Sequence, residues 1–474
     1  MRVLLINPPR FNEIRADNPA FMEEERGFNP PLGLLYLAGY LKKYSHHQVF
    51  CLDAQVEKFN YGEEFIQKII QMNPDAVCLT VMTFTLIDVL KTIKLIKEAQ
   101  KSLNKKIIIV LGGPHAHLFP KETAALGGVD FVIKGEGEIS FFRLLEAVEG
   151  RGELTQVKGL VYKDKGSIVD NPVGDLIENL DELPFPDRKL LPVEKYSSIL
   201  GGGHIVTTMF TSRGCPFQCA FCDRPHLGKK FRARSPKNVV DEMEQCLKLG
   251  IEEILIYDDT FTVNKQRVLD ICDEIIKRRL KFVWDIRARV DTVDQEVLAV
   301  MKKAGCQRIH FGVEAGTEKI LKVLNKKITL EQVEKAFRLA KALGFETLAY
   351  FMIGAPTETR EDIRQTINFA KKLNPDYAHI TILAPYPGTV IYKQALEQGV
   401  IKSDYWREFA LHPEKETATQ YWEKELTKEE LYETLNKFYK EFYGRPFYIL
   451  RELFKVRSFK DFIKKAKTGL KILK

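Results

Sequence analysis

The chain has 474 residues, 45% of them hydrophobic, which is enough for two or three globular domains with sizeable cores. Its net charge of +8 resides in the tail, because residues 444–474 hold ten basic and two acidic side chains while the other 443 residues hold 62 of each sign. A neutral body with a basic tail is not typical of an enzyme with a long phosphate-binding groove, so we expect no nucleic-acid partner.

The first 150 residues form the first predicted domain, in which short apolar runs alternate with amphipathic stretches. We predict strands at 3–7, 48–53, 76–82, 106–111 and 131–134, and helices at 31–43, 62–72, 85–101, 119–126 and 138–149. Five units of a strand and a helix predict an α/β fold with a doubly wound parallel sheet.

Ligands of such a sheet bind at the carboxyl ends of its strands, so the loops that follow the strands are candidate contacts. The candidate residues in these loops are Asn7, Thr83, Thr85, Gly112, Gly113, His115, Gly135 and Glu136. Glycine pairs let the backbone approach a ligand closely, although His115 could instead cap a helix. The chain lacks the GxxxxGK(S/T) pattern, and no GxGxxG opens the first helix, which disfavours nucleoside triphosphates and simple dinucleotides.

Residues 151–203 form a predicted linker that contains a hairpin sequence, LVYKDKGSIVD, and the glycines at 201–203. From residue 204 the alternation resumes, and we predict strands near 205–212, 253–258, 281–287, 308–314, 346–353 and 377–383. Six such units in residues 204–400 predict a partial (β/α)6 barrel, followed at 401–474 by a helical region that ends in the basic tail.

Three of the eight cysteines, Cys215, Cys219 and Cys222, follow the first barrel strand with the spacing CxxxCxxC, and the other five lie singly in apolar segments. With no signal-peptide pattern and no apolar run of membrane-spanning length, we expect a cytoplasmic protein, where clustered cysteines typically hold metal. Three thiolates without a fourth leave one coordination position open, which favours an iron–sulfur cluster over zinc. Zinc remains possible with His226 as the fourth ligand.

The cysteine segment resembles the radical S-adenosylmethionine (radical SAM) signature CxxxCxΦC, with Phe221 as the aromatic residue. The resemblance implies a 4Fe-4S cluster on the three cysteines, SAM bound to its open iron, and a 5′-deoxyadenosyl radical. Further matches at the strand ends imply SAM contacts by Asp258 and Asp259 for the amino group, by Glu314 for the ribose and carboxylate, and by Gly354 and Pro356 beside the adenine. Arg287 and Arg289 could meet the SAM carboxylate.

Several of these residues have an alternative role that needs no ligand. Asp258 and Asp259 could cap a helix or be solvated, and Arg287 and Arg289 could pair with acids. Glu314, in an apolar strand, is harder to explain in this way because a buried carboxylate needs a partner.

The first domain resembles that of radical SAM enzymes with a cobalamin-binding domain, a group with C-methyltransferases and the anaerobic porphyrin-ester cyclase. The matching segments are LLINPP, PPLGLLYLAGYL, GGPHA and GEGE. Cobalamin proteins generally supply an axial histidine from DxHxxG, but here Gln55 stands at the histidine position and Lys58 at the glycine. Cobalamin should therefore lack a histidine lower ligand, or the domain holds no cofactor.

The resemblance implies a cobalamin-dependent radical SAM enzyme that methylates an unactivated carbon of a small molecule. An oxidative cyclase or C–C bond-forming enzyme acting on a tetrapyrrole or lipid is the second hypothesis, and a cobalamin-binding sensor or carrier with a structural cluster is the third. A flavodoxin or ferredoxin is the expected electron donor.

Residues 458–474 have the pattern of a basic amphipathic helix. Its apolar residues recur at spacings of three and four and form one stripe, with lysines around it. The stripe consists of Phe459, Phe462, Ile463, Ala466, Leu470 and Leu473. Such a helix could dock on the barrel or attach the protein to anionic lipid at the inner face of the membrane.

Overall fold

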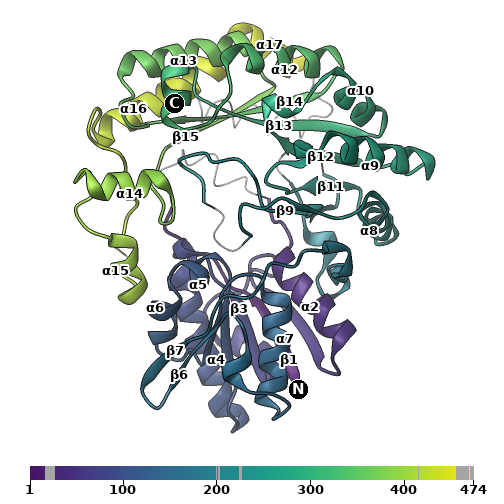
Figure 1. Ribbon diagram of the computed structural model, residues 1–474, viewed down its shortest axis with the longest axis vertical. Helices are drawn as coiled ribbons and strands as arrows, with labels where there is room; N and C mark the ends of the chain where they lie inside the picture. Colours follow the sequence, from purple (N-terminus) through teal and green to yellow (C-terminus); the bar gives the residue numbers. More distant parts are fainter. Residues whose placement is uncertain are drawn as a thin grey trace.

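The computed structural model describes residues 1–15, 27–198, 200, 203–223, 227–414, 416–454 and 469. In this part of the chain two α/β units are stacked along the long axis of the molecule, and the segment around β9 (Ser212–Arg213) lies between them (Figure 1).

The N-terminal unit is a seven-stranded sheet in the order β2-β1-β3-β4-β5-β6-β7. Its strands are β1 (Arg2–Asn7), β2 (Gln48–Asp53), β3 (Ala76–Thr80), β4 (Ile108–Gly112), β5 (Phe131–Ile133), β6 (Leu160–Asp164) and β7 (Ser167–Asp170). The first five are parallel, as predicted, and β6 and β7 add an antiparallel hairpin to β5. The hairpin that we assigned to the linker therefore belongs to the N-terminal sheet.

Helices cover both faces of this sheet, because its central strands are apolar on both sides. In β1, Leu4 and Ile6 pack in one hydrophobic cluster and Val3 and Leu5 in another, all fully buried. The helices are α2 (Leu32–Tyr44), α3 (Glu63–Met72), α4 (Leu86–Leu103), α5 (Pro114–Leu118), α6 (Pro120–Ala125) and α7 (Gly137–Val148).

The second unit is a six-stranded, wholly parallel sheet with β8 and β15 at its edges, which confirms the predicted partial barrel. Its strands are β8 (Val206–Met209), β11 (Glu253–Ile256), β12 (Val283–Ala288), β13 (Cys306–Glu314), β14 (Glu346–Ile353) and β15 (Tyr377–Ile382). The outer helices are α8 (Pro236–Lys248), α9 (Lys265–Lys277), α10 (Gln295–Lys303), α11 (Glu318–Val323), α12 (Leu330–Ala342) and α13 (Arg360–Leu373).

The C-terminal helices cover one barrel edge and connect the barrel to the N-terminal unit. They are α14 (Val390–Glu397), α15 (Tyr405–Leu411), α16 (Lys428–Tyr443) and α17 (Pro446–Phe454). Tyr439 and Tyr443 of α16 bond the backbone of β15 at Ile380 and Ala378 with distances of 2.8–3.0 Å, which satisfies an otherwise open strand edge. Helix α15 reaches down to α6 (Figure 1).

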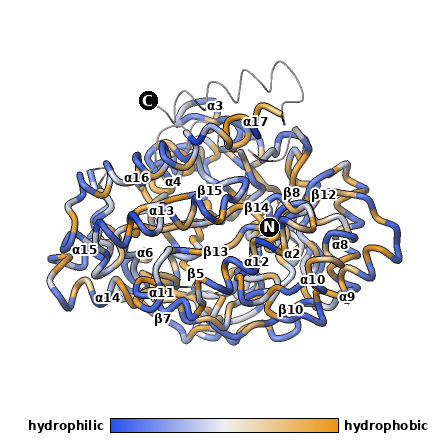
Figure 2. Tube along the Cα trace, turned by 90° about the horizontal axis from the view of Figure 1, so that it is seen from above, coloured by the Kyte–Doolittle hydropathy of each residue, from blue (hydrophilic) through white to orange (hydrophobic). Residues whose placement is uncertain are grey.

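Helix α17 contains apolar residues and lies at the edge of the molecule (Figure 2). Phe447 is 72% exposed and Phe454 is 83% exposed. The predicted amphipathic tail at 458–474 falls outside the described residues, apart from residue 469. Within the described ranges, no helix has both the length and the hydropathy needed to cross a bilayer.

Candidate active site and cofactor sites

The three clustered cysteines lie in a loop whose two ends are joined. Strand β9 pairs antiparallel with β10 (Arg232–Ala233), and Arg213 lies opposite Arg232. Gly214 has a φ of +78°, and a Cβ there would collide with the carbonyl oxygen of Lys230, so only glycine suits this position. The loop therefore starts from a fixed point at the carboxyl end of β8, where ligands of such sheets bind.

The surroundings of the thiols fit a cluster. Cys215 is 4% exposed. Its Sγ lies 3.9 Å from the hydroxyl of Thr260. Arg289 directs Nη1 to Sγ of Cys219 at 3.7 Å and thus places positive charge beside a sulfur that must be a thiolate to bind iron. The backbone N–H of Cys222 donates to the carbonyl of Cys219 at 3.2 Å.

Contacts with the rest of the barrel hold the same loop from outside. The N–H of Ala220 donates to Leu324 O at 2.9 Å, and Ala220 O accepts from the N–H of Ile391 at 3.1 Å. The guanidinium of Arg289 also lies 3.9 Å from the ring centroid of Phe217. The cysteine loop is thus positioned by elements from the middle and the end of the barrel sequence.

Zinc finds less support than a cluster. Among the described residues, three potential ligand atoms lie within 4.8 Å of one another only at His47, Glu146 and Glu149, so the three cysteines do not form such a group. His226, the zinc alternative, lies outside the described residues.

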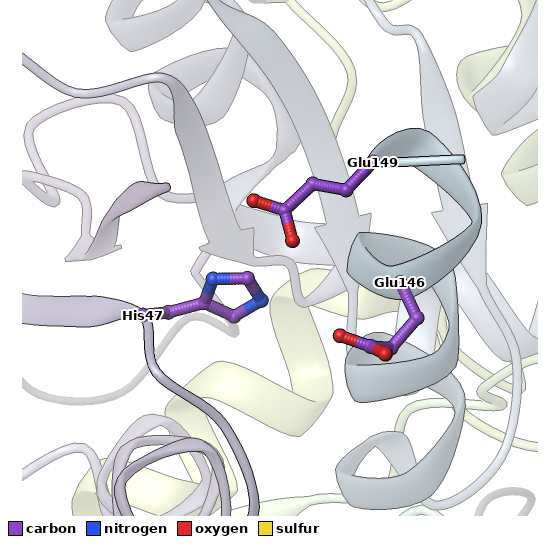
Figure 3. Close-up of side chains that lie close together, drawn as sticks. All are labelled: His47, Glu146 and Glu149. Atoms are coloured by element: carbon purple, nitrogen blue, oxygen red, sulfur yellow. The ribbon is translucent and has the colours of Figure 1, made fainter. Parts of the chain in front are cut away.

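His47, Glu146 and Glu149 lie close together (Figure 3), and other groups pair with the two glutamates. The N-terminal amine donates to Glu149 at 3.3 Å, and Arg151 bonds both glutamates, so their negative charge is already balanced. His47 directly precedes β2, at the amino-terminal edge of the sheet, opposite the edge where ligands bind.

Asp258 supports the cysteine loop. Its carboxylate is fully buried and accepts from both backbone N–H groups and both hydroxyls of Thr211 and Ser212. Both oxygens are therefore occupied by the turn before the cysteines, so Asp258 is neither a helix cap nor a solvated acid, and it presents no open oxygen to SAM. Asp259, the next residue, is exposed at the same strand end.

Glu314 has the partner that a buried carboxylate requires. It is 7% exposed. Lys326 donates to Glu314 Oε1 at 2.6 Å. Glu314 has a φ of +71°, an uncommon conformation for a residue with a side chain. The ammonium group of Lys326 also lies 5.9 Å from the ring centroid of Phe221. Lys326 therefore contacts both the carboxyl end of β13 and the cysteine loop.

The Gly354–Glu358 segment is held from inside. Oε2 of Glu358 accepts from the N–H of Gly354 at 2.6 Å and of Ala355 at 2.9 Å. Oε1 is buried without a hydrogen-bond partner in the described part of the structure. Burial raises the pKa of Glu358 to about 7, although the two N–H bonds oppose this. Gly354 has a φ of +83°, and Pro356 is buried beside it.

The two arginines of the third barrel unit have separate roles. The guanidinium of Arg287 stacks 3.7 Å from the ring centroid of Tyr257. Arg289, just beyond β12, bonds both oxygens of Asp291 at 2.9 Å in addition to its contact with Cys219. Arg289 therefore pairs with an acid, as the alternative without a ligand proposed, whereas Arg287 packs against an aromatic ring.

In the N-terminal sheet, Gln55 takes part in a network at the ends of β1 and β2. Its Nε2 donates to Asn7 Oδ1 at 3.2 Å and to Pro8 O at 3.0 Å. Asn7 donates to Asp53, which also accepts from Tyr196. The position of the usual axial histidine is thus occupied by an amide that is bonded to its own loop.

His115 fits a ligand contact better than a cap. It is fully buried, and its Nδ1 lies 3.1 Å from the hydroxyl of Thr83. Its Nε2 is buried without a hydrogen-bond partner among the described residues, a feature that bound ligands often explain. Burial lowers the pKa of His115 to about 3, so the imidazole is neutral. An imidazole that can still accept or donate one bond suits a cofactor such as cobalamin.

The neighbouring loop residues shape the same strand ends. Gly113 has a φ of +111° and would collide with Val81 O if it carried a Cβ, whereas a Cβ at Gly112 would meet only Ile133 O, at 4.0 Å. Thr85 bonds the backbone of Met82 through its hydroxyl and starts α4. The structure thus brings the β3 and β4 loops together, as expected for a ligand edge.

Glu136 lies in a buried contact between the two units. It is 3% exposed and lies 2.9 Å from both Arg213 and Arg232, which flank the cysteine loop. Glu138 also bonds Arg213, and Gly135 donates its N–H to His117 at 3.1 Å. The carboxylate of Glu136 is therefore bound by protein groups, and the GEGE segment connects the N-terminal sheet to the cysteine loop.

Comparisons with known proteins identify both domains. Residues 209–370 match the radical SAM superfamily, and residues 22–145 match the B12 binding domain. An uncharacterized methyltransferase of Pyrococcus horikoshii is 36% identical over 475 residues, which cover 99% of this chain and 98% of the relative. The anaerobic magnesium-protoporphyrin IX monomethyl ester cyclase of Rubrivivax gelatinosus is 32% identical over 402 residues, 83% of this chain and 70% of that protein.

The fold is similar to a solved structure of the cobalamin-dependent S-adenosylmethionine radical enzyme OxsB with aqua-cobalamin and S-adenosylmethionine bound. The TM-score is 0.76 at 19% sequence identity, and the match covers 99% of this chain and 71% of that chain.

Proposed function

Since the chain belongs to the cobalamin-dependent radical SAM enzymes, a family with methyltransferases and cyclase-like members, we propose that it methylates an unactivated carbon of a small molecule. One observation carries the proposal: the loop with three thiols is joined through Arg213 and Glu136 to the ligand edge of a B12-binding sheet. A shared, fixed position for two cofactors suits a radical that forms at one and reacts near the other.

We assign the described residues to three groups of contacts. The cluster is held by Cys215, Cys219 and Cys222, and SAM by Phe221, Asp259, Arg287, Glu314, Gly354 and Pro356. Cobalamin is held by Asn7, Thr83, Thr85, Gly112, Gly113, His115 and Gly135, while Asp258 and Glu136 position the cysteine loop. When bound, the cluster and SAM supply a 5′-deoxyadenosyl radical, and cobalamin supplies a methyl group or accepts an electron.

Replacing one cysteine of the loop tests the cluster assignment. Cys219→Ala should abolish the iron–sulfur absorbance and SAM cleavage, because two protein ligands cannot hold a cluster with one open iron. Cys272→Ala is the matched control, since Cys272 is fully buried in the apolar core and should be replaceable. Full SAM cleavage by Cys219→Ala would overturn the assignment.

Product analysis separates methylation from the alternatives. With SAM labelled in its methyl group, methylation places the label in the product, whereas a cyclase leaves the product unlabelled. The 32% identity to the Rubrivivax gelatinosus cyclase is the observation that keeps cyclisation as the second candidate. An intact cluster that cleaves no SAM under a strong reductant would instead support a sensor or carrier.

We further propose a flavodoxin or ferredoxin as the electron donor.

The lower ligand of cobalamin can be tested separately. We expect the electron paramagnetic resonance spectrum of the cob(II)alamin form to show no nitrogen splitting from a lower ligand, because Gln55 is bonded to Asn7 and Pro8. A clear imidazole splitting would contradict this and would implicate His115 or His117.

We also propose peripheral attachment to anionic lipid at the inner face of the membrane. Support comes from the basic amphipathic sequence at 458–474 and from the exposed apolar residues of α17 just before it, such as Phe454 at 83% exposure. Deleting residues 458–474 should reduce sedimentation with anionic vesicles and leave SAM cleavage nearly intact. Loss of solubility together with SAM cleavage would show that the tail packs on the barrel.

A further inference from the structure

The inward face of the barrel is polar and partly accessible. On β13, the outward residues Ile309, Phe311 and Val313 are fully buried against the helices, while the inward His310 alternates with them and keeps a 13% exposed side chain. The inward Tyr350 on β14 is partly accessible as well, in contrast to its fully buried neighbour Ala349. The barrel interior is therefore lined by groups that can hydrogen-bond a substrate.

Three inward residues on adjacent strands form a hydrogen-bonded chain. Oδ2 of Asp285 on β12 lies 3.3 Å from Nε2 of His310 on β13. Nδ1 of the same imidazole lies 3.0 Å from the hydroxyl of Tyr350 on β14. Arg308 anchors the chain from below through its ion pair with Asp285 at 3.2 Å.

The carboxylate fixes the direction of these hydrogen bonds. An ionised carboxylate only accepts, so Nε2 of His310 carries the proton, and in a neutral imidazole Nδ1 is then the acceptor. Tyr350 must therefore donate its single O–H to Nδ1. Its oxygen is left with two lone pairs. The Arg287 side chain hydrogen-bonds this oxygen, and the second lone pair can accept from a ligand in the barrel interior.

Tyr350 is placed beneath the SAM residues. It lies in register with Gly312, two residues before Glu314 on the neighbouring strand, a separation of roughly 7 Å along the strand. Burial raises the pKa of Tyr350, the nearby Arg287 opposes this, and Tyr257 and Asp285 reinforce it. The phenol thus remains protonated at neutral pH, as donation to His310 requires.

We propose that Tyr350 binds the substrate inside the barrel by accepting a hydrogen bond from a hydroxyl or N–H group of the substrate, with His310 and Asp285 as positioning residues. This inference rests on the proposed function, since it takes the barrel as the substrate site. The substrate should therefore carry a hydrogen-bond donor and should not be a pure hydrocarbon.

The direction of the hydrogen bonds from Tyr350 through His310 to Asp285 can be determined by nuclear magnetic resonance on holoprotein labelled with 15N-histidine. The His310 signal is identified by its loss in His310→Asn. We expect a neutral imidazole with its proton on Nε2, and a shift of the Nδ1 signal in Tyr350→Phe. Tyr377→Phe, which changes another inward tyrosine on β15, is the matched control and should leave the signal unchanged. A proton on Nδ1 would overturn the inference, because Tyr350 would then be free to donate.

Contact with a donor is tested by titrating the same protein with benzyl alcohol and with benzyl methyl ether. The alcohol should move the Nδ1 signal, and its apparent affinity should fall about threefold to tenfold in Tyr350→Phe, as for loss of one neutral hydrogen bond. Equal effects of alcohol and ether, or no effect of either, would overturn the contact. These readouts need no turnover, so a wild type that cleaves no SAM would refute the proposed function separately.

Discussion

Replacing Glu136 by glutamine tests whether the contact between the two units holds the cysteine loop. Three side chains form the centre of this contact, and all are nearly inaccessible: Glu136 at 3%, Arg213 at 7% and Arg232 at 1% exposure. The second oxygen of Glu136 also accepts from the N–H of Ile177 at 2.7 Å. Glu136→Gln keeps the shape of the side chain and removes its charge.

The expected cost follows from this geometry. Removing one partner of a buried ion pair typically costs about 3–5 kcal/mol, because the other charge is left buried and unpaired. Arg213 keeps its ion pair with Glu138, so only Arg232 is left without a charged partner among the described residues. We therefore expect the lower end of that range, about 3 kcal/mol. Burial raises the pKa of Glu136, but Arg232 and Arg213 outweigh it and the pKa lies below its ordinary value. The stabilisation is therefore present at neutral pH and is lost as pH falls through the folded-state pKa.

The assay is loss of the iron–sulfur absorbance during urea unfolding of the reconstituted protein. Glu178→Gln is the control, because Glu178 pairs with Lys230 at the surface with side chains 64% and 62% exposed and should contribute less than about 1 kcal/mol. Glu136→Gln should release the cluster at lower urea, and its difference from wild type should shrink as pH falls below 4.5, the ordinary value of the carboxyl. Equal behaviour of the two variants would refute the role of Glu136.

Three further changes probe the residues around the cluster and SAM. Asp258→Asn should cost about 2 kcal/mol and weaken cluster retention, measured in the same urea assay, because an amide has only one accepting oxygen and would direct its NH2 group at donors. Gly312→Ala should raise the Kd of SAM at least about tenfold in equilibrium dialysis, because its Cβ would collide with Glu314, whereas Gly33→Ala, with open space around it, should not. The free energy of unfolding should fall as pH rises from 4.5 to about 7, because Glu358 binds its proton more tightly in the folded protein than in the unfolded chain. In Glu358→Gln this part of the pH dependence should be absent.

The sequence predicted those parts of the fold that local patterns determine. Strand β1 reads as apolar on both faces, and its residues Val3 to Ile6 are all buried, so the doubly wound sheet was predictable. The five single cysteines were correctly assigned to the core, and burial raises the pKa of Cys78 to about 12, which keeps that thiol protonated. The cysteine loop was predictable because its ligands are close together in sequence.

Contacts between distant segments could not be predicted in this way. The GEGE segment carries the composition of a ligand loop, yet the partner of Glu136 lies 77 residues away in the barrel. Asp258 binds a turn 47 residues earlier. Neither pairing leaves a periodic signal, because it depends on how two units pack. Lys326 is only 12 residues from Glu314, but its pairing depends on the turn that ends β13.

The position of the cysteine loop is set by three parts of the chain at once. Arg213 and Arg232 join its ends to Glu136 of the N-terminal unit, and Ala220 bonds the barrel at Leu324. After β15, Gly388 packs against Asp223 of the loop so closely that a Cβ would collide with it, and the same Cβ would lie 3.1 Å from Leu118 of α5. The loop is therefore fixed relative to both units by direct contacts, and the linker between them need not be rigid. A radical reaction between groups held by two domains requires this kind of fixed geometry, since a displacement of about 1 Å can cost a hundredfold in rate.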